Sequence, residues 1–196
     1  MTKKDILGIV KTSAILLLIC LVITALLAVT NKYTKKPIAD IAKKTEQETM
    51  QKIVPAKSYE QKSVDYNNET YTVNIAKDGE DVKGYVFSLK SKGYGGDISV
   101  MTGIGTDGKV IAVSIVDASN ETPGLGQNVT KESFYSQYSG KTDNIEVVKS
   151  NADDNQITAV TGATISSKAV TRAVNTALEV FYNSGSFGDF TNGEAN

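Results

Sequence analysis

The sequence predicts an α+β protein: a single N-terminal transmembrane helix followed by one domain with a mainly antiparallel sheet and packed helices. Three observations support this class. Residues 12–31 carry no charged side chain, strand-like segments separated by turn residues recur between residues 70 and 116, and apolar residues repeat at helical spacing after residue 164. A helix with one apolar stripe must bury it, and a sheet offers a matching surface.

The uncharged N-terminal stretch is long enough to cross a membrane. Its core, Ala14 to Val29, is nearly all Ile, Leu, Val and Ala, and twenty helical residues span about 30 Å, the thickness of the hydrocarbon core. A cleaved signal peptide is the alternative, but the stretch is long for one and no convincing Ala-x-Ala site follows. We therefore expect an uncleaved transmembrane helix at residues 12–31, after residues 1–11 and before a stalk and linker at residues 32–69.

Composition excludes several classes of function. The chain has net charge −1, but residues 1–36 hold six lysines and one aspartate, so the remainder carries −6. An acidic soluble part argues against a nucleic-acid partner. Cys20 is the only cysteine, which excludes a disulfide within the chain and a cysteine-ligated iron–sulfur or zinc site.

The first elements expected after the transmembrane stretch are a helix and two strands. Pro37 can occupy the first position of a helix that reaches about Ile53 and is closed by Pro55. Residues 70–76 are rich in Thr, Tyr and Val and alternate, and residues 84–89 also alternate, so both segments are predicted strands.

A hairpin is the clearest local prediction. Residues 98–105 and 110–116 flank Asp107-Gly108, and Asp-Gly is a favoured two-residue turn. The second strand is apolar at almost every position, which predicts a central strand covered on both faces.

The C-terminal half is expected to hold short elements and one long helix. The pattern predicts a short helix at residues 131–138, short strands at residues 145–149 and 157–160, and a helix at residues 165–181. The residues at 184–196, rich in Gly, Asn and Ser, are predicted to form a flexible tail that follows a domain spanning residues 70–183.

The segment Thr161-Gly162-Ala163-Thr164-Ile165-Ser166-Ser167 begins the long helix and holds the main candidate residues. Ser and Thr are favoured helix N-caps, so capping is one interpretation. The unpaired N–H groups and the dipole of a helix start also suit a phosphate. An exposed Thr could instead be a nucleophile. The chain has no histidine, so only lysine or a carboxylate could serve as its base.

Two glycine-rich loops precede this segment. Gly93-Tyr94-Gly95-Gly96 is either a plain turn or a binding loop. Residues 121–126 follow the predicted central strand, where loops often carry binding residues. In this second loop Leu125 lies between two glycines and suits contact with a flat ring, and Glu121 could accept hydrogen bonds that orient the loop.

Together these blocks resemble the FMN-binding domain family. Residues 161–167 resemble its flavinylation signature (S/T)-G-A-T-x-(S/T)-S, residues 121–126 its E-T-P-G-L-G loop, and residues 93–98 its G-Y-G-G-x-I segment. Their order and spacing are similar to those of the G subunits of Rnf electron-transport complexes and of their cousins, the C subunits of sodium-pumping NADH:quinone oxidoreductases. Two positions differ from the family pattern: Ser119 replaces a frequent His, and Thr158 stands where the family tends to place an Asp.

The resemblance implies FMN attached through a phosphoester to Thr164, by a flavin transferase that uses FAD and magnesium. It implies no catalytic residue and no metal ligand in this chain. The cofactor-binding residues that it implies are Thr161, Gly162, Ala163, Thr164, Ser166 and Ser167 in the helix turn, and Glu121, Thr122, Pro123, Gly124, Leu125 and Gly126 in the loop.

The resemblance also implies a function and a location. The chain would be an electron-carrying flavoprotein subunit of a membrane-bound ferredoxin:NAD oxidoreductase coupled to sodium or proton transport, with membrane and iron–sulfur subunits as partners. Lysines flank both ends of the apolar stretch, so charge alone would keep the domain in the cytoplasm. The family implies residues 1–11 in the cytoplasm and the flavin domain outside. The alternative is an anchored extracytoplasmic binding or structural domain without a redox cofactor.

Overall fold

The computed structural model describes residues 3–142, 144–185 and 187. The chain divides into two compact units, Met1–Thr45 and Glu46–Asn196. Helix α1, Lys3–Ile53, provides the first unit and the beginning of the second.

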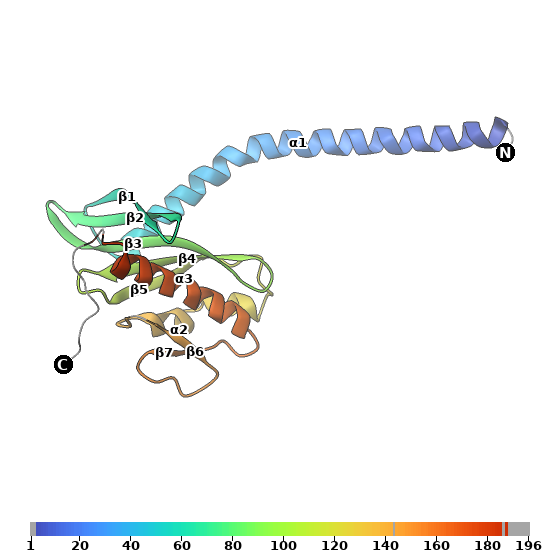
Figure 1. Cartoon of the computed structure of the whole chain (residues 1–196). Coiled ribbons are helices and arrows are strands. Elements are labelled where there is room, and N and C mark those ends of the chain that lie inside the picture. Colours follow the sequence, from blue (N-terminus) through green and yellow to red (C-terminus); the bar gives the residue numbers. More distant parts are fainter. Residues whose placement is uncertain (1–2, 143, 186, 188–196) are drawn as a thin grey trace. The chain divides into compact units, whose positions relative to one another are not determined.

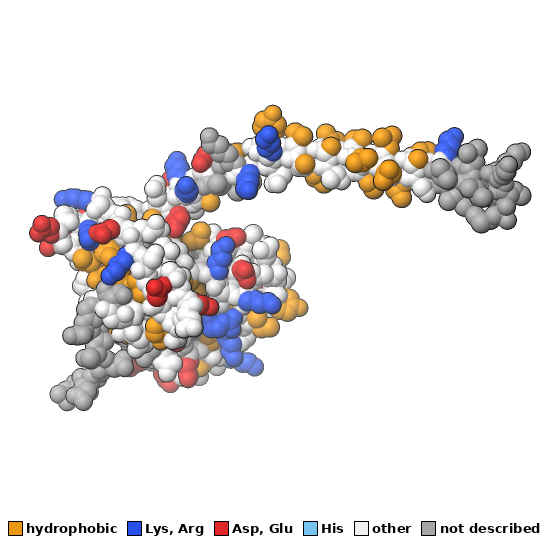
Figure 2. Space-filling view, turned by 45° about the horizontal axis from the view of Figure 1, so that its top comes forward, with side chains coloured by type: hydrophobic (Ala, Val, Ile, Leu, Met, Phe, Trp, Pro, Cys, Tyr) orange, Lys and Arg blue, Asp and Glu red, His pale blue; other side chains and the backbone are white. Residues whose placement is uncertain are grey.

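The first unit is helical, and large apolar side chains between Ile15 and Val29 are exposed (Figure 2). Within the described residues, one helix is long and apolar enough to cross a membrane. The expectation that Pro37 begins a new helix is wrong, because Pro37 lies inside α1. A proline inside a helix removes one backbone hydrogen bond, and here the helix continues through that gap.

The second unit is built on a five-stranded antiparallel sheet with the strand order β1-β2-β3-β4-β5 (Figure 1). Each strand pairs with the next one along the chain, as successive hairpins require. The strands are β1 (Ser58–Tyr66), β2 (Glu69–Asp78), β3 (Asp81–Lys92), β4 (Asp97–Gly105) and β5 (Val110–Asp117).

Short elements follow the sheet and lead into one long helix. They are η1 (Gly126–Thr130), α2 (Glu132–Tyr135), η2 (Ser136–Tyr138), β6 (Glu146–Val148), β7 (Gln156–Thr158) and α3 (Thr164–Asn183). Strands β6 and β7 form a separate two-stranded parallel sheet. These elements agree with the α+β class and the antiparallel sheet predicted from the sequence.

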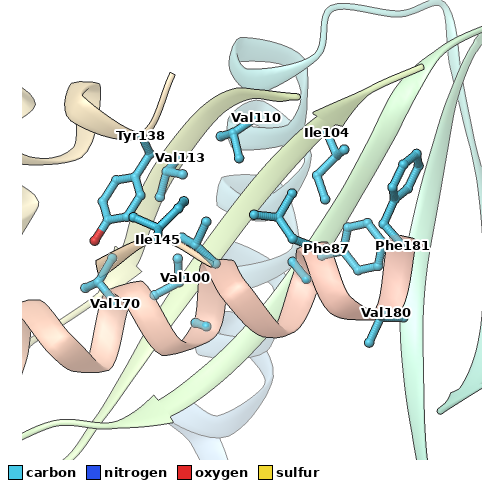
Figure 3. Close-up of a cluster of buried hydrophobic side chains, with 14 of the residues drawn as sticks. Phe87, Val100, Ile104, Val110, Val113, Tyr138, Ile145, Val170, Val180 and Phe181 are labelled. Atoms are coloured by element: carbon cyan, nitrogen blue, oxygen red, sulfur yellow. The ribbon is translucent and has the colours of Figure 1, made fainter. Parts of the chain in front are cut away.

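The two faces of the main sheet bury different partners, because side chains alternate along each strand. One face packs against α3, where Phe87 and Ile104 of the sheet meet Phe181 of the helix (Figure 3). The other face packs against the end of α1 through a smaller cluster, which consists of Met50, Ile53, Val54, Ala76, Val86 and Met101. The apolar stripe predicted for α3 is buried from Ala169 to Phe181, whereas its first residue, Ile165, is exposed.

Strand β5 differs from its prediction. It was expected to be central and covered on both faces, but it is the edge strand of the sheet. Ile111 and Val116 are each 38% exposed. The outer backbone edge of β5 is partly covered by two hydrogen bonds. The Val110 N–H donates to the Lys141 carbonyl at 2.9 Å, and the Val110 carbonyl accepts from the Gly140 N–H at 2.8 Å. A continuous apolar run indicates strand formation without fixing the position of the strand in its sheet.

Both ends of the globular unit also extend beyond the expected domain. The expected stalk and linker at residues 32–69 contains strand β1, and the compact unit begins at Glu46 rather than residue 70. Within the predicted tail at residues 184–196, Phe187 is buried and stacks on Phe181 with 5.6 Å between ring centroids. Residues 186 and 188–196 of that tail lie outside the described residues.

Candidate functional site

The beginning of α3 leaves hydrogen-bonding groups available. Its N-cap residue is Ala163, and no side chain caps the helix, so the interpretation of this segment as a Ser or Thr cap is not supported. The first helical backbone bond runs from Ser167 N–H to the Ala163 carbonyl at 3.0 Å. Within the described residues, the N–H groups of residues 164–166 have no partner, a normal consequence of helix geometry that suits an anion.

Thr164 is the first residue of α3 and is half-buried. Its hydroxyl makes no hydrogen bond within the part of the chain that the structure describes. Gly162, two residues earlier, has φ of +77°, a conformation that favours glycine. Thr161 is exposed and Ala163 is buried. The turn therefore presents Thr164 Oγ1 without a competing internal partner.

The two serines of the segment, which were expected to contact a bound cofactor, are both buried. Ser166 and Ser167 are 1% and 0% exposed. Ser166 Oγ donates to the Glu121 carboxylate. Ser167 Oγ donates to the Ala163 carbonyl and accepts from Val160 N–H, each at 3.0 Å. Both hydroxyls therefore have partners within the protein that stabilise the turn.

Glu121 joins the three motifs. Its side chain is 2% exposed, and its carboxylate accepts from Gly95 N–H at 2.9 Å and from Ser166 Oγ. The nearby backbone N–H groups of Tyr94 and Gly96 also favour its charged form. Burial raises the pKa of Glu121, but these hydrogen bonds outweigh burial and hold its pKa below the ordinary value of 4.5. These contacts support the expectation that Glu121 orients the loops.

The 93–96 loop needs glycines because its backbone packs closely against the loop that contains Glu121. A Cβ on Gly93 would lie 2.4 Å from Glu121 Oε1, and one on Gly95 would lie 1.9 Å from the Asn120 carbonyl oxygen. Gly126 has the same function on the other side, where a Cβ would lie 2.6 Å from Glu121 Oε2. Glycine at these positions therefore lets the 93–96 loop and the 121–126 loop pack closely around one carboxylate.

A groove of about 590 Å³ lies where the three motifs meet. This volume falls in the range of about 300–1,000 Å³ that is typical of small-molecule sites. Its lining residues are Tyr94, Glu121, Thr122, Leu125, Gly126, Gly162, Ala163, Thr164, Ile165 and Ser166. Large apolar side chains remain exposed around it, since Tyr94, Leu125 and Ile165 are 72%, 46% and 54% exposed. Sequence reasoning had not selected Tyr94 or Ile165 as site residues, although an aromatic residue between glycines is a usable signal.

The remaining loop residues predicted for the site lie at its edge. Thr122, Pro123 and Gly124 are exposed, and only Thr122 lines the groove. The Thr122 carbonyl accepts from Leu125 N–H at 3.1 Å, which closes the turn. Leu125 lies beside the helix turn, because a Cβ on Gly162 would be 3.2 Å from its Cδ2. Pro123 and Gly124 therefore shape the loop, whereas Leu125 forms part of the wall.

A larger polar hollow of about 760 Å³ lies elsewhere on the globular unit. It is lined by polar side chains such as Lys141, Glu146 and Asp153, and contains none of the predicted site residues. Shape alone would select this hollow, whereas the convergence of motifs selects the groove at Thr164.

The ionised state of Glu121 predicts an acid-dependent loss of stability. A carboxylate whose pKa is lower in the folded state stabilises the fold above its unfolded pKa, and this contribution is lost as pH falls through the folded pKa. Glu121→Gln should therefore unfold more easily at neutral pH, by about 1–2 kcal/mol, yet lose less stability than the wild type between about pH 6 and pH 3. Denaturant unfolding at both pH values measures this; equal acid losses in the two proteins would contradict it.

Family models match both parts of the chain. Residues 93–179 match the FMN-binding domain, and residues 1–53 match the RnfG N-terminal region. The first range contains all three motifs of the groove, and the second ends where α1 ends.

Two relatives and one solved structure are similar to this chain. The chain is 34% identical to the G subunit of the Na(+)-translocating ferredoxin:NAD(+) oxidoreductase complex of Acetobacterium woodii over 191 residues, which cover 88% of this chain and 91% of that protein. It is 49% identical over 105 residues to the proton-translocating counterpart of Clostridium ljungdahlii, covering 53% of this chain and 56% of that protein. The crystal structure of NqrC from Shewanella oneidensis aligns with a TM-score of 0.49 and 24% identity over 61% of this chain and 56% of that one. The chain therefore belongs to the family of Rnf complex G subunits.

Proposed function

We propose that this chain is an electron-carrying flavoprotein subunit of a membrane-bound ferredoxin:NAD oxidoreductase complex coupled to sodium or proton transport, with FMN bound covalently to Thr164. The observation that carries the proposal is the unpaired Thr164 hydroxyl at an uncapped helix start, in a groove formed by all three motifs. Its relatives are named as subunits of such complexes and differ in the ion that they translocate.

The residues present fit FMN. The free N–H groups at the start of α3 suit a phosphate. Gly162 has a positive φ, which favours glycine, and because glycine has no side chain the turn stays open to a ligand. Leu125, Ile165 and Tyr94 provide exposed apolar surface for a flat ring. Bound FMN supplies the electron chemistry, whereas the protein holds and orients it.

Attachment would require a partner enzyme. We propose a flavin transferase that uses FAD and magnesium, so that Thr164 Oγ1 forms the bond to phosphorus, AMP leaves, and the hydroxyl proton passes to the transferase. Within the described residues, no side chain hydrogen-bonds to Thr164 and could remove that proton, so the base is assigned to the transferase. A covalent link keeps the cofactor from diffusing away.

The proposed location follows from the N-terminal helix. Residues 12–31 would span the membrane once, with residues 1–11 in the cytoplasm and the flavin domain on the extracytoplasmic side. Membrane and iron–sulfur subunits of the complex would be its partners. Large domains can translocate despite basic residues after the span, so the flanking lysines do not exclude this orientation.

Intact-mass measurement tests the cofactor proposal directly. The full chain is produced with and without a flavin transferase, purified in detergent and weighed. We expect the matured protein to gain the mass of FMN less one water and to be yellow. A mature sample with the mass of the bare polypeptide would refute attachment and favour a binding or structural domain without a redox cofactor.

A further inference from the structure

Arg172 lies outside all three motifs but contacts the base of one of them. It is an exposed residue of α3, just over two turns beyond Thr164. Its Nη2 donates to the Lys92 carbonyl at 2.7 Å, and its Nε donates to Ser91 Oγ at 3.3 Å. Ser91 and Lys92 are the last residues of β3, directly before the glycine loop at residues 93–96.

The same loop is held at its tip by the same helix. Gly95 N–H donates to Glu121, and Ser166 of α3 donates to the other carboxylate oxygen. Within the loop, Gly93 N–H donates to the Gly96 carbonyl at 2.7 Å. The hydrogen bonds therefore form a closed ring that runs from Arg172 to the loop, through Glu121 and back to α3 at Ser166.

We infer that Arg172 is a positioning residue for the groove, which together with Glu121 holds the 93–96 loop on the N-terminal part of α3, between Ser166 and Arg172. Because both attachment points lie on one helix, the loop and the helix start move as one body. The ring thereby fixes Tyr94 relative to Thr164 before any ligand is present. The consequence for a bound flavin rests on the proposed function; the ring itself does not.

The two charged side chains of the ring, Glu121 and Arg172, differ in how deeply they are buried. Glu121 is buried and ionised, so its bonds are charge-assisted. Arg172 is exposed, so its substitution removes the contact without opening a cavity in the core. Arg172→Ala is therefore the informative variant, Arg172→Lys keeps one donor for the Lys92 carbonyl, and Lys168→Ala is a matched control that removes an exposed cation from the same helix.

Amide hydrogen exchange of the flavin-free full chain in detergent tests the ring. We expect the peptide covering residues 92–97 to exchange about three- to tenfold faster in Arg172→Ala, as expected for lost hydrogen bonds. Arg172→Lys should lie between Arg172→Ala and the wild type, and Lys168→Ala should match the wild type. Unchanged exchange in Arg172→Ala, or an equal increase in Lys168→Ala, would overturn the inference.

The flavin-loaded protein tests the positioning role. Per attached flavin, the visible circular dichroism should weaken in Arg172→Ala and recover partly in Arg172→Lys, because a loosened loop orients the ring less uniformly. Faster loop exchange with an unchanged flavin spectrum would overturn the positioning role. If even the wild type carries no flavin, the proposed function fails, and the exchange measurement still decides whether the ring exists.

Discussion

Replacement of Thr164 by valine should abolish covalent flavin attachment completely. Valine has nearly the same shape and fits the first position of α3, but it has no hydroxyl to form an ester. Since Thr164 makes no side-chain hydrogen bond within the described residues, the fold should lose little stability. In-gel flavin fluorescence after production with a flavin transferase measures the effect, and intact mass should equal that of the bare polypeptide.

Two variants serve as controls for this result. Thr161→Val removes the other threonine hydroxyl of the same turn, which is exposed, and should keep its fluorescence. Ser119→His introduces the side chain that the family often has there and should also keep it. Unchanged fluorescence in Thr164→Val would refute Thr164 as the attachment site. Combined with loss in Thr161→Val, it would move the assignment to Thr161.

Gly95→Ala should be among the most damaging single substitutions in the groove. The added Cβ would lie 1.9 Å from the Asn120 carbonyl oxygen, and no side-chain rotation can relieve an overlap between two backbones. Overpacking usually costs about 1–3 kcal/mol, and we expect this variant to lie at or above the upper end. The displaced loop would also remove a hydrogen bond from the buried Glu121 carboxylate, which adds to the loss.

Thermal or denaturant unfolding measures this destabilisation. Tyr94→Ala is the matched control, because it changes the neighbouring residue of the same loop, whose side chain is 72% exposed; it should alter stability by less than about 0.5 kcal/mol. A Gly95→Ala protein as stable as Tyr94→Ala would show that the loop can move away from Asn120 freely, contrary to the close packing described above.

Local signals predicted much of the fold. The strands that flank Asp107-Gly108 appear as β4 and β5, because β propensity is a property of neighbouring residues. The connection is longer than the expected two-residue turn, since β4 ends at Gly105 and β5 begins at Val110. Helix α3 begins within one residue of its expected start, because the helical spacing of apolar residues is also a local pattern. The missed strand β1 contains only one buried residue, Val64. An edge strand with so little apolar pattern gives hardly any signal before its partner is known.

The motifs predicted which segments form the candidate site, but they did not predict the contacts among those segments. Gly93 and Gly95 resemble ordinary turn glycines in the sequence, and their clash partners lie about 25 residues further along the chain. The inward direction of Ser166 was equally hidden, since its partner Glu121 belongs to another loop. Such requirements arise only when distant segments meet, so a reading of local patterns assigns residue types without their partners.

The contact between the end of α1 and the sheet affects how a water-soluble fragment should be cut. A fragment that starts at residue 70 would lose β1 and would expose Ala76, Val86 and Met101, which Met50, Ile53 and Val54 now cover. Such an apolar patch promotes aggregation. Cleavage between Thr45 and Glu46 instead keeps the covering turn of helix with the flavin domain, and gives spectroscopy a sample free of detergent.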